Sequence, residues 1–370
     1  MDHVNVIIVG AGLSGVGAAA HLVEQCPEKT FTLLEGRAAV GGTWDLFRYP
    51  GIRSDSDMHT LGYSFKPWTQ AKSIADGPSI RDYVNETADE FDIRRHIRFD
   101  HKVQTASWDS TQSHWVLTSN LSDGSTTKIS GDFLFMCGGY YSYDDPHRPE
   151  FPGESRYQGQ VLHPQFWPED LDYEGKKVIV IGSGATAMTI VPSMTQKGAQ
   201  VTMVQRSPTY VVSRPAEDKI ANTLRKWLPE KWAYAITRLK NTTLSGYFYR
   251  QTRSQPAKTK AQLLGMATAN LGEEMVKAHF TPSYNPWDQR MCLIPDGDLY
   301  QSINEGSAQV VTGDIETWTE QGLVMKDGTE VTGDIIVTAT GITLTVMSGI
   351  AFDLDGDALL HNMRNRVAGA

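Results

Sequence analysis

The chain has 370 residues, enough for two domains that each bury a hydrophobic core. Its formal net charge of −9 argues against nucleic acid as the main partner. Three scattered cysteines offer neither a disulfide framework nor a Cys-x-x-Cys redox pair, and ten histidines show no paired metal-ligand spacing. These features predict a cytoplasmic protein without a metal site.

The start of the chain predicts a dinucleotide site. A strand-like apolar run, 5–9, leads into Gly10-Ala-Gly12-Leu-Ser-Gly15, and a helical run, a second strand and Glu35 follow. Glycine interruptions and the lack of a basic leader argue against a signal peptide or membrane span. Gly10 permits the tight turn, Gly12 lets the backbone approach a pyrophosphate, and Gly15 lets helix and strand pack closely. Glu35 falls where an acid accepts hydrogen bonds from a ribose diol.

A glycine- and aromatic-rich stretch, 41–55, comes next and predicts a long loop without regular structure. It is either an ordinary surface loop or a loop that wraps a flat ring system and presents Asp55 to the site. Loops of this length inside a compact domain tend to be functional.

Two later parts of the chain repeat one pattern. Residues 103–129 predict an antiparallel meander, and 132–137 a buried strand that ends in glycine. Residues 310–331 predict a second meander, and 334–338 a second buried strand before a glycine. The echo predicts two related nucleotide-binding units.

The second unit begins at residues 177–181, followed by Gly182-Ser-Gly184-Ala-Thr-Ala187, a helix and a strand. Alanine is allowed at the third position of the fingerprint. This strand ends in Arg206, where the first unit has an acid. An acid suits a free ribose hydroxyl, whereas an arginine suits a 2′-phosphate, so we expect FAD or NAD in the first unit and NADPH in the second. The alternative for Arg206 is a surface cation.

Residues 157–168 lie between the two loops, with Gly159, His163 and Trp167 at four-residue steps. A segment that joins two cofactor units is well placed to control how they move against each other.

Residues 219–260 form a helical segment with ten basic residues, one acid and several aromatic residues. It is either an amphipathic surface for an acidic membrane or partner, or a helical insertion whose charges lie in water. We expect the insertion, because no uninterrupted apolar stripe is evident.

A proline-rich stretch, 280–296, carries Arg290 directly before an apolar strand. Arg290 is either a ligand-binding residue or a structural ion-pair donor, and its position alone leaves both readings open.

Taken together, the motifs resemble the class B flavoprotein monooxygenases, and the Baeyer–Villiger type within them. One signature of that family is met by Tyr157, Gly159, His163, Trp167 and Pro168, with tyrosine where phenylalanine is usual. A second signature is met by Gly41, Gly42, Trp44, Tyr49, Pro50, Gly51 and Asp55. Residues 42–57, 163–173, 205–210 and 284–290 further resemble the ethionamide-activating branch.

The resemblance implies a role for each motif. Arg290 matches the catalytic arginine, Asp55 would hold it in place, and His163 would couple cofactor binding to domain rotation. The implied FAD contacts are Gly10, Gly12, Ser14, Gly15, Glu35, Gly42, Thr43, Trp44, Asp45, Leu46, Asp55 and Val103. The implied NADPH contacts are Arg53, Ser54, Asp55, Gly182, Ser183, Gly184, Ala185, Thr186, Ala187, Met188, Arg206 and Ser207.

The implied reaction is oxygenation of a small molecule. Hydride passes from NADPH to FAD, and O2 adds to the reduced flavin as a C4a-peroxide. The peroxide inserts oxygen next to a ketone carbonyl, giving an ester or lactone, or oxygenates a sulfur compound. Arg290 would stabilise the anions, where losing one donor commonly costs about 3–4 kcal/mol.

Residues 355–370 do not resemble the family's substantial C-terminal segment, which suggests a truncated chain. An uncoupled NADPH oxidase and a non-catalytic remnant are therefore the alternatives.

We expect an α/β fold with two Rossmann-like three-layer dinucleotide-binding domains, each with a small antiparallel β-meander, plus a helical insertion. The expected FAD-binding domain is 1–145, and the NADPH-binding domain is 146–340 with the insertion at 216–282. Residues 341–370 would begin a return to the FAD domain. The expected partners are O2 and a ketone or sulfur-containing substrate, with peripheral membrane contact through 219–260 as the weaker alternative.

Overall fold

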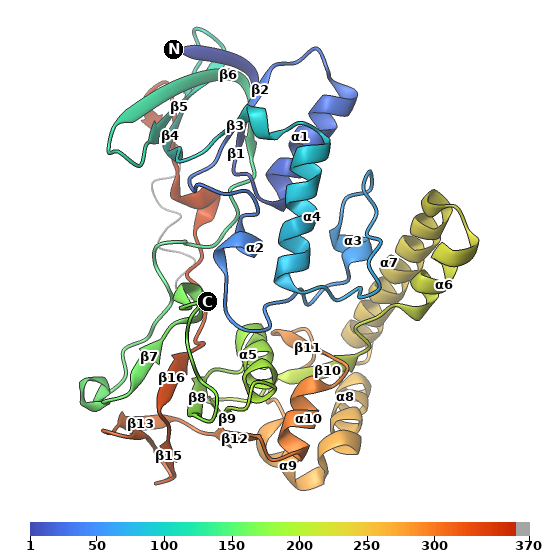
Figure 1. The fold of residues 1–370 in the computed structure, drawn as a ribbon, viewed down its shortest axis with the longest axis vertical. Helices are drawn as coiled ribbons and strands as arrows, with labels where there is room; N and C mark the ends of the chain where they lie inside the picture. The colour runs from blue at the N-terminus through green and yellow to red at the C-terminus, as the bar shows by residue number, and fades with distance from the viewer. Residues whose placement is uncertain (360–370) are drawn as a thin grey trace. The chain divides into compact units, whose positions relative to one another are not determined.

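A computed structural model describes residues 1–359 (Figure 1). The chain forms two compact units, which are described separately. The first unit comprises residues 1–46, 77–146 and the segment from 342 onward, and the second comprises 47–76 and 147–341. Residues 47–76 therefore group with the second unit, whereas the sequence analysis placed them in the first.

The first unit is built on an eight-stranded sheet with the order β18-β17-β4-β5-β6-β1-β2-β3. β1, β2, β3 and the end of β6 are parallel, while β4, β5 and the start of β6 form the expected antiparallel meander. The strands are β1 (Asp2–Val9), β2 (Phe31–Leu34), β3 (Ile97–Arg98), β4 (Lys102–Asp109), β5 (His114–Asn120), β6 (Thr126–Met136), β17 (Ala351–Leu354) and β18 (Asp357–Ala358).

Two faces of this sheet are covered differently, which gives three layers. α1 packs on β1 and β2, and α4 packs on α1. On the other face Ile7 and Val9 of β1 share a core with Ala106 and Leu117 of the meander. The helical elements of this unit are α1 (Leu13–Gln25), α2 (Thr43–Leu46), α4 (Gly77–Glu90), η1 (Arg94–His96) and η4 (Val346–Gly349).

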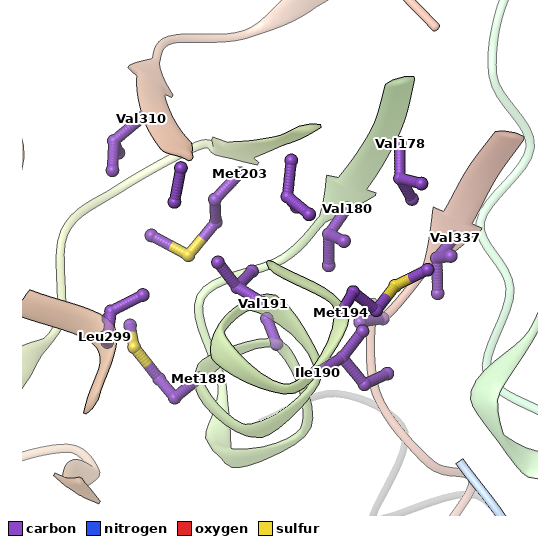
Figure 2. Close-up of a cluster of buried hydrophobic side chains, with 14 of the residues drawn as sticks. Val178, Val180, Met188, Ile190, Val191, Met194, Met203, Leu299, Val310 and Val337 are labelled. Atoms are coloured by element: carbon purple, nitrogen blue, oxygen red, sulfur yellow. The ribbon is translucent and has the colours of Figure 1, made fainter. Parts of the chain in front are cut away.

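The second unit is built on a five-stranded parallel sheet with the order β12-β9-β8-β16-β7. Figure 2 shows Met188, Ile190, Val191 and Met194 of α5 packed toward the side chains of these strands. The strands are β7 (Gln160–Leu162), β8 (Lys177–Ile181), β9 (Gln200–Gln205), β12 (Ala308–Thr312) and β16 (Ile335–Thr338), beside a two-stranded pair, β10 (Tyr210–Arg214) and β11 (Met291–Pro295).

A three-stranded meander covers the opposite face of this sheet. Trp318, Leu323 and Met325 pack there against Ile179 and Ile336 of the parallel strands. The unit therefore also has three layers, as the sequence predicts. The meander strands are β13 (Ile315–Trp318), β14 (Gly322–Met325) and β15 (Glu330–Thr332).

Equivalent close contacts in the two units confirm the internal repeat that the sequence predicts. A Cβ on Gly10 would lie 2.7 Å from the carbonyl oxygen of Cys137, and one on Gly182 would lie 2.2 Å from that of Ala339. Likewise, a Cβ on Gly131 or on Gly333 would lie 2.8 Å from Cγ1 of an isoleucine in the strand that precedes the glycine loop of its unit. In both units a returning strand pairs parallel with that strand, and only glycine leaves room where the backbones approach so closely.

Two local expectations are corrected. Residues 126–136 form one continuous strand, β6, because its first half extends the meander and its second half pairs with β1. The second half is not buried as expected, since Phe133 is 53% exposed and Phe135 is 45% exposed. Residues 43–46 form one helical turn, α2, because Gly41 and Gly42 carbonyls accept hydrogen bonds from the backbone N–H groups of residues 44–46.

The helical segment lies in the second unit, where α6 runs beside the first part of α7 (Figure 1). Among the described residues, no helix is both long and apolar enough to cross a membrane. The helices of this unit are α3 (Met58–Leu61), η2 (Glu154–Arg156), η3 (Pro164–Phe166), α5 (Ala185–Thr195), α6 (Lys219–Trp227), α7 (Glu230–Ser254), α8 (Pro256–Leu271), α9 (Glu273–His279) and α10 (Asp298–Asn304).

Candidate active site

The first glycine loop has the geometry that a dinucleotide loop requires. Gly10 adopts φ +97, a region that favours glycine. A Cβ on Gly15 would lie only 1.9 Å from the carbonyl oxygen of Gly10, so helix and loop can approach only here. Gly12 is the N-cap of α1 without a side-chain cap, which leaves the first N–H groups of the helix for an anion.

Glu35 ties this loop to the end of β2. The Ala11 N–H donates to Oε2 at 2.7 Å, and the Arg37 N–H donates to Oε1 at 2.9 Å. Burial raises the pKa of the Glu35 carboxyl, although these two backbone donors oppose the shift. Each carboxylate oxygen keeps a second lone pair, which can accept a ribose hydroxyl.

The Gly-Gly motif lies directly beside this loop. The Gly41 N–H donates to the Ala11 carbonyl at 3.0 Å, and a Cβ on Gly42 would lie 3.0 Å from Cα of Gly12. Two backbone segments thus meet at glycine positions, in keeping with a site where backbone approaches a ligand closely.

Two residues that the sequence analysis did not select support α2. Arg37 pairs with the buried Asp45 at 2.8 Å, and its guanidinium lies 5.9 Å from the ring centroid of Tyr143. Tyr143 hydrogen bonds with the Thr43 side chain, and burial raises the pKa of its hydroxyl. Asp45, an expected FAD contact, thus forms an ion pair that no local sequence pattern predicts.

The other expected FAD contacts of this unit differ in exposure. Ser14 is exposed in the first turn of α1, and Trp44 and Leu46 are half-buried in α2. Val103 lies in the hydrophobic core with 8% exposure, so only its backbone is available to a ligand.

The second signature is divided between the two units. Gly41 to Leu46 belong to the first unit, and the residues from Phe47 onward belong to the second. In the second unit, Tyr49 hydrogen bonds with the Thr186 side chain, and burial raises the pKa of its hydroxyl to about 12. A Cβ on Gly51 would lie 1.7 Å from Oγ of Ser193, so this stretch packs tightly on α5.

Arg53 and Ser54 are engaged within the second unit. The Arg53 guanidinium pairs with both carboxylate oxygens of Asp298, at 2.5 and 3.4 Å, and both side chains are largely buried. Ser54 is buried, and its Oγ donates to the Ser56 carbonyl at 2.8 Å. Both expected NADPH contacts therefore also stabilise the conformation of residues 53–56 within the second unit.

The second glycine loop repeats the first. Gly182 adopts φ +139, and Gly184 is the N-cap of α5 without a side-chain cap. Oγ of Ser183 donates to the Ser207 carbonyl at 3.2 Å, which links this loop to the next strand end. Ala185 is exposed, whereas Ala187 and Met188 are buried in the core beneath the loop.

Arg206 and Ser207 follow β9, which neighbours β8 in the parallel sheet. Both residues are exposed at the edge where the glycine loop also lies. Within residues 1–359 no acidic side chain pairs with Arg206, so its guanidinium is available to a phosphate.

Arg290 lies against the second loop. A Cβ on Gly184 would lie 3.6 Å from Cζ and Nη1 of Arg290. The Arg290 carbonyl accepts from the Tyr284 hydroxyl at 3.1 Å and from Thr209 Oγ1 at 3.3 Å. The two hydroxyl oxygens lie 2.9 Å apart, so with one proton each they either both donate to this carbonyl or one donates to the other, and in both cases a polar clamp holds the backbone of Arg290 just before β11.

Asp55 is exposed and forms no ion pair with Arg290 in the described part of the chain. Both charges act on Cys292 in β11, where burial raises the pKa of the thiol to about 11, Arg290 opposes the shift and Asp55 adds to it. The expected pairing of Asp55 with Arg290 is therefore not among the described contacts.

His163 lies at the end of β7, where its Nδ1 accepts from the Gln165 N–H at 3.2 Å. Its Nε2 is buried and has no hydrogen bond within residues 1–359. Burial lowers the pKa of His163, and the backbone of Gly341 and His147 opposes the shift. Those two residues lie at two of the four points where the chain crosses between the units, so His163 lies beside these two linkers.

Two glycine loops at the carboxyl ends of parallel strands, each opening an uncapped helix, define an α/β protein of the two-dinucleotide class. A family model described as FMO-like, flavin-binding monooxygenase-like, matches residues 3–348. The chain belongs to this family. Among the described residues, no group of three or more His, Cys, Asp or Glu is arranged to hold a metal ion.

Several named proteins are similar over almost the whole chain. FAD-containing monooxygenase EthA of Mycolicibacterium smegmatis is 50% identical over 357 residues, which cover 96% of this chain and 72% of that protein. Probable FAD-binding monooxygenase AlmA of Acinetobacter baylyi is 46% identical over 360 residues, with coverage of 96% and 72%.

Solved structures share the fold. A structure described as oxidized steroid monooxygenase bound to NADP superposes with a TM-score of 0.78 at 26% identity, covering 95% of this chain and 73% of that one. An open crystal structure of cyclohexanone monooxygenase gives a TM-score of 0.75 at 21% identity, covering 95% and 76%.

Proposed function

We propose that the protein is an FAD-containing, NADPH- and O2-dependent Baeyer–Villiger-type monooxygenase. It inserts oxygen next to a ketone carbonyl, forming an ester or lactone, or oxygenates a sulfur compound. Membership of the flavin-binding monooxygenase-like family supports the flavin chemistry. The likeness to a steroid monooxygenase bound to NADP supports the second dinucleotide.

We assign FAD to the first unit. Gly12 and Gly42 carry no side chain, so a pyrophosphate can approach the backbone there and at the uncapped start of α1. Glu35 retains lone pairs that can accept hydrogen bonds from a ribose diol. When bound, FAD would carry electrons from NADPH to O2, and O2 supplies the oxygen atom that enters the substrate. The protein's part is to bind, orient and exclude water.

We assign NADPH to the second unit. The uncapped start of α5 fits its pyrophosphate, and the exposed guanidinium of Arg206 with Ser207 fits a 2′-phosphate. A planar guanidinium with several donors suits a phosphate better than a point charge does.

The observation that carries the proposal is the position of Arg290 against Gly184 of the second loop. The clamp from Tyr284 and Thr209 fixes its backbone before any ligand arrives. A fixed cation stabilises negative charge that develops on oxygen, and oxygen insertion requires such stabilisation. We assign Asp55, an exposed carboxylate of the same unit, the role of balancing this cation.

The proposal is tested on purified protein supplied with FAD, NADPH and panels of ketones and thioethers. We expect oxygenated product in proportion to the NADPH consumed. Flavin-loaded protein that yields only hydrogen peroxide would point to an oxidase, and protein that takes up no FAD would point to a non-catalytic relative; both results contradict the proposal.

The role of Arg290 is tested by Arg290→Ala and Arg290→Lys. We expect both variants to reduce the flavin yet lose oxygenated product by about 100-fold or more, since removal of one such donor commonly costs about 3–4 kcal/mol. Arg214→Ala is the matched control, because Arg214 is an exposed arginine at the other end of the β10–β11 pair. Native product formation by Arg290→Ala would refute the assignment.

A further inference from the structure

The hairpin of α6 and α7 exposes an unusual amount of apolar surface. Trp227 at the end of α6 is 82% exposed, and Trp232 in the first turn of α7 is 65% exposed. Ile220, Ile236 and Leu239 are 56%, 42% and 68% exposed. We call these five side chains the hairpin surface. Water-exposed tryptophans of this degree are uncommon and mark interaction sites.

The exposed side chains follow helical spacing. Trp232, Ile236 and Leu239 lie at i, i+4 and i+7 on α7, which places them on one face. Ile220 and Trp227 lie at i and i+7 on α6. The sequence itself predicted no uninterrupted apolar stripe here. The structure shows one, because Ala233 and Thr237 take the buried face of α7 and leave this stripe to water.

The hairpin itself is firmly folded, so its exposed face is not a frayed end. Lys240 of α7 pairs with Asp218, the N-cap of α6, at 2.6 Å. Arg225 donates to the carbonyls of Trp68 and Gln70 at 3.1 Å, and Arg238 donates to that of His59 at 3.0 Å. The basic residues on the buried side therefore hold the hairpin to its unit.

Other cations of the hairpin remain in water. Lys219, Lys226 and Lys231 are exposed, and within residues 1–359 none of them pairs with an acid. Lys226 precedes Trp227, and Lys231 precedes Trp232. Residues 219–260 carry ten basic residues against one acid in a chain whose net charge is −9. The one acid, Glu230, is exposed beside Lys231, so the exposed tryptophans lie in a segment of net positive charge.

We propose that the hairpin surface binds the face of a phospholipid bilayer that contains anionic lipid. Trp227 and Trp232 enter the headgroup region, Ile220, Ile236 and Leu239 contact the acyl boundary, and the three lysines contact lipid phosphates. Tryptophan prefers this interfacial region, and apolar burial together with lysine–phosphate attraction sets the strength of such binding.

Charge complementarity favours an anionic surface over a neutral partner, and exposed tryptophans beside exposed lysines are typical of a bilayer interface. Each exposed lysine adds roughly a fivefold preference for an anionic membrane surface, since one cation near it is worth ~1 kcal/mol. The described helices do not cross a membrane, which agrees with a helix pair that lies on the surface.

The experiment is co-sedimentation of the full chain with vesicles of phosphatidylcholine alone or mixed in equal parts with phosphatidylglycerol. We expect binding to the mixed vesicles, weakening as salt rises, because ions screen the lysine–phosphate attraction. Tryptophan fluorescence should shift to the blue on binding. No preference for the anionic vesicles would overturn the proposal.

Two double variants separate the contributions. W227S/W232S should abolish the fluorescence shift and weaken vesicle binding at least tenfold. Lys226→Gln with Lys231→Gln should weaken binding about 25-fold, from roughly fivefold for each lysine. Because these side chains are exposed, both variants should keep the native melting temperature and NADPH oxidation in solution.

Matched controls come from the first unit, where Phe133 is 53% exposed and Lys128 is exposed. Phe133→Ser and Lys128→Gln should bind vesicles as the native chain does. If the hairpin variants bind as well as the native chain, or if the controls weaken binding equally, the surface is not a lipid-binding site. Binding to an acidic polypeptide but not to vesicles would likewise overturn the proposal.

Discussion

Replacing Gly184 with alanine isolates the second dinucleotide loop. The backbone of Gly184 has φ −84 and ψ −178, which any residue can adopt. The nearest atoms to the added methyl group would be Cζ and Nη1 of Arg290, at 3.6 Å, and Nε at 3.9 Å. These are ordinary van der Waals distances, so we expect Gly184→Ala to fold with a native melting temperature.

The same methyl group would occupy the side of the loop where a phosphate approaches. Hydrogen bonds to a charged group are worth about 1.5–3 kcal/mol each, so displacing the pyrophosphate from one backbone N–H weakens binding about 10- to 150-fold. The dissociation constant of NADP+ should rise by this factor in calorimetric titration. Flavin reduction at saturating NADPH should change far less, because FAD is assigned to the other unit.

Two further glycines provide the controls. Gly182 adopts φ +139, and a Cβ added there would lie 2.2 Å from the Ala339 carbonyl oxygen. Gly182→Ala should therefore lower the free energy of unfolding by about 2 kcal/mol or more. Gly246 lies inside α7 with nothing near it, and alanine there should stabilise by up to about 1 kcal/mol. If folded Gly184→Ala binds NADP+ as tightly as the native protein, the loop does not hold the phosphates.

Three more outcomes are expected. Arg206→Ala should lower the preference for NADPH over NADH at least tenfold, since a charge-assisted contact of about 1.5–3 kcal/mol is lost; an unchanged ratio of kcat/KM values contradicts the contact. Tyr284→Phe removes one donor to the Arg290 carbonyl and should lower the oxygenated product per NADPH while flavin reduction persists; native coupling would show that the clamp is dispensable. Burial lowers the pKa of His163 below its ordinary 6.5, so its contribution is complete above pH 6.5 and is lost as pH falls through the folded pKa. His163→Asn should therefore reduce the loss of unfolding free energy on acidification below pH 6.5, and an unchanged pH slope would count against the shift.

Local patterns of the sequence determined the two glycine loops, the strands and helices around them and the repeat of the two units. These features depend on residues that are close in the sequence. A few neighbouring positions suffice to show a turn that needs glycine, a helix start without a side-chain cap, or alternating apolar residues. The equal contacts at Gly131 and Gly333 show how closely the two units obey the same local rules.

Only the tertiary structure decided what each polar side chain contacts. Arg53 and Asp298 are 245 residues apart, and Tyr284 and Thr209 are 75 apart, so no short-range pattern predicts either pair. The division of the Gly41 to Asp55 stretch between two units likewise depends on where its halves pack.

The exposure of Trp227 and Trp232 has the same origin. The sequence favoured a packed insertion without an apolar stripe, because which face of a helix meets water is set by the residues that α3, α6 and the neighbouring loops present to it. Burial is a property of the whole packed unit, because contacts between distant segments determine which surface is left over.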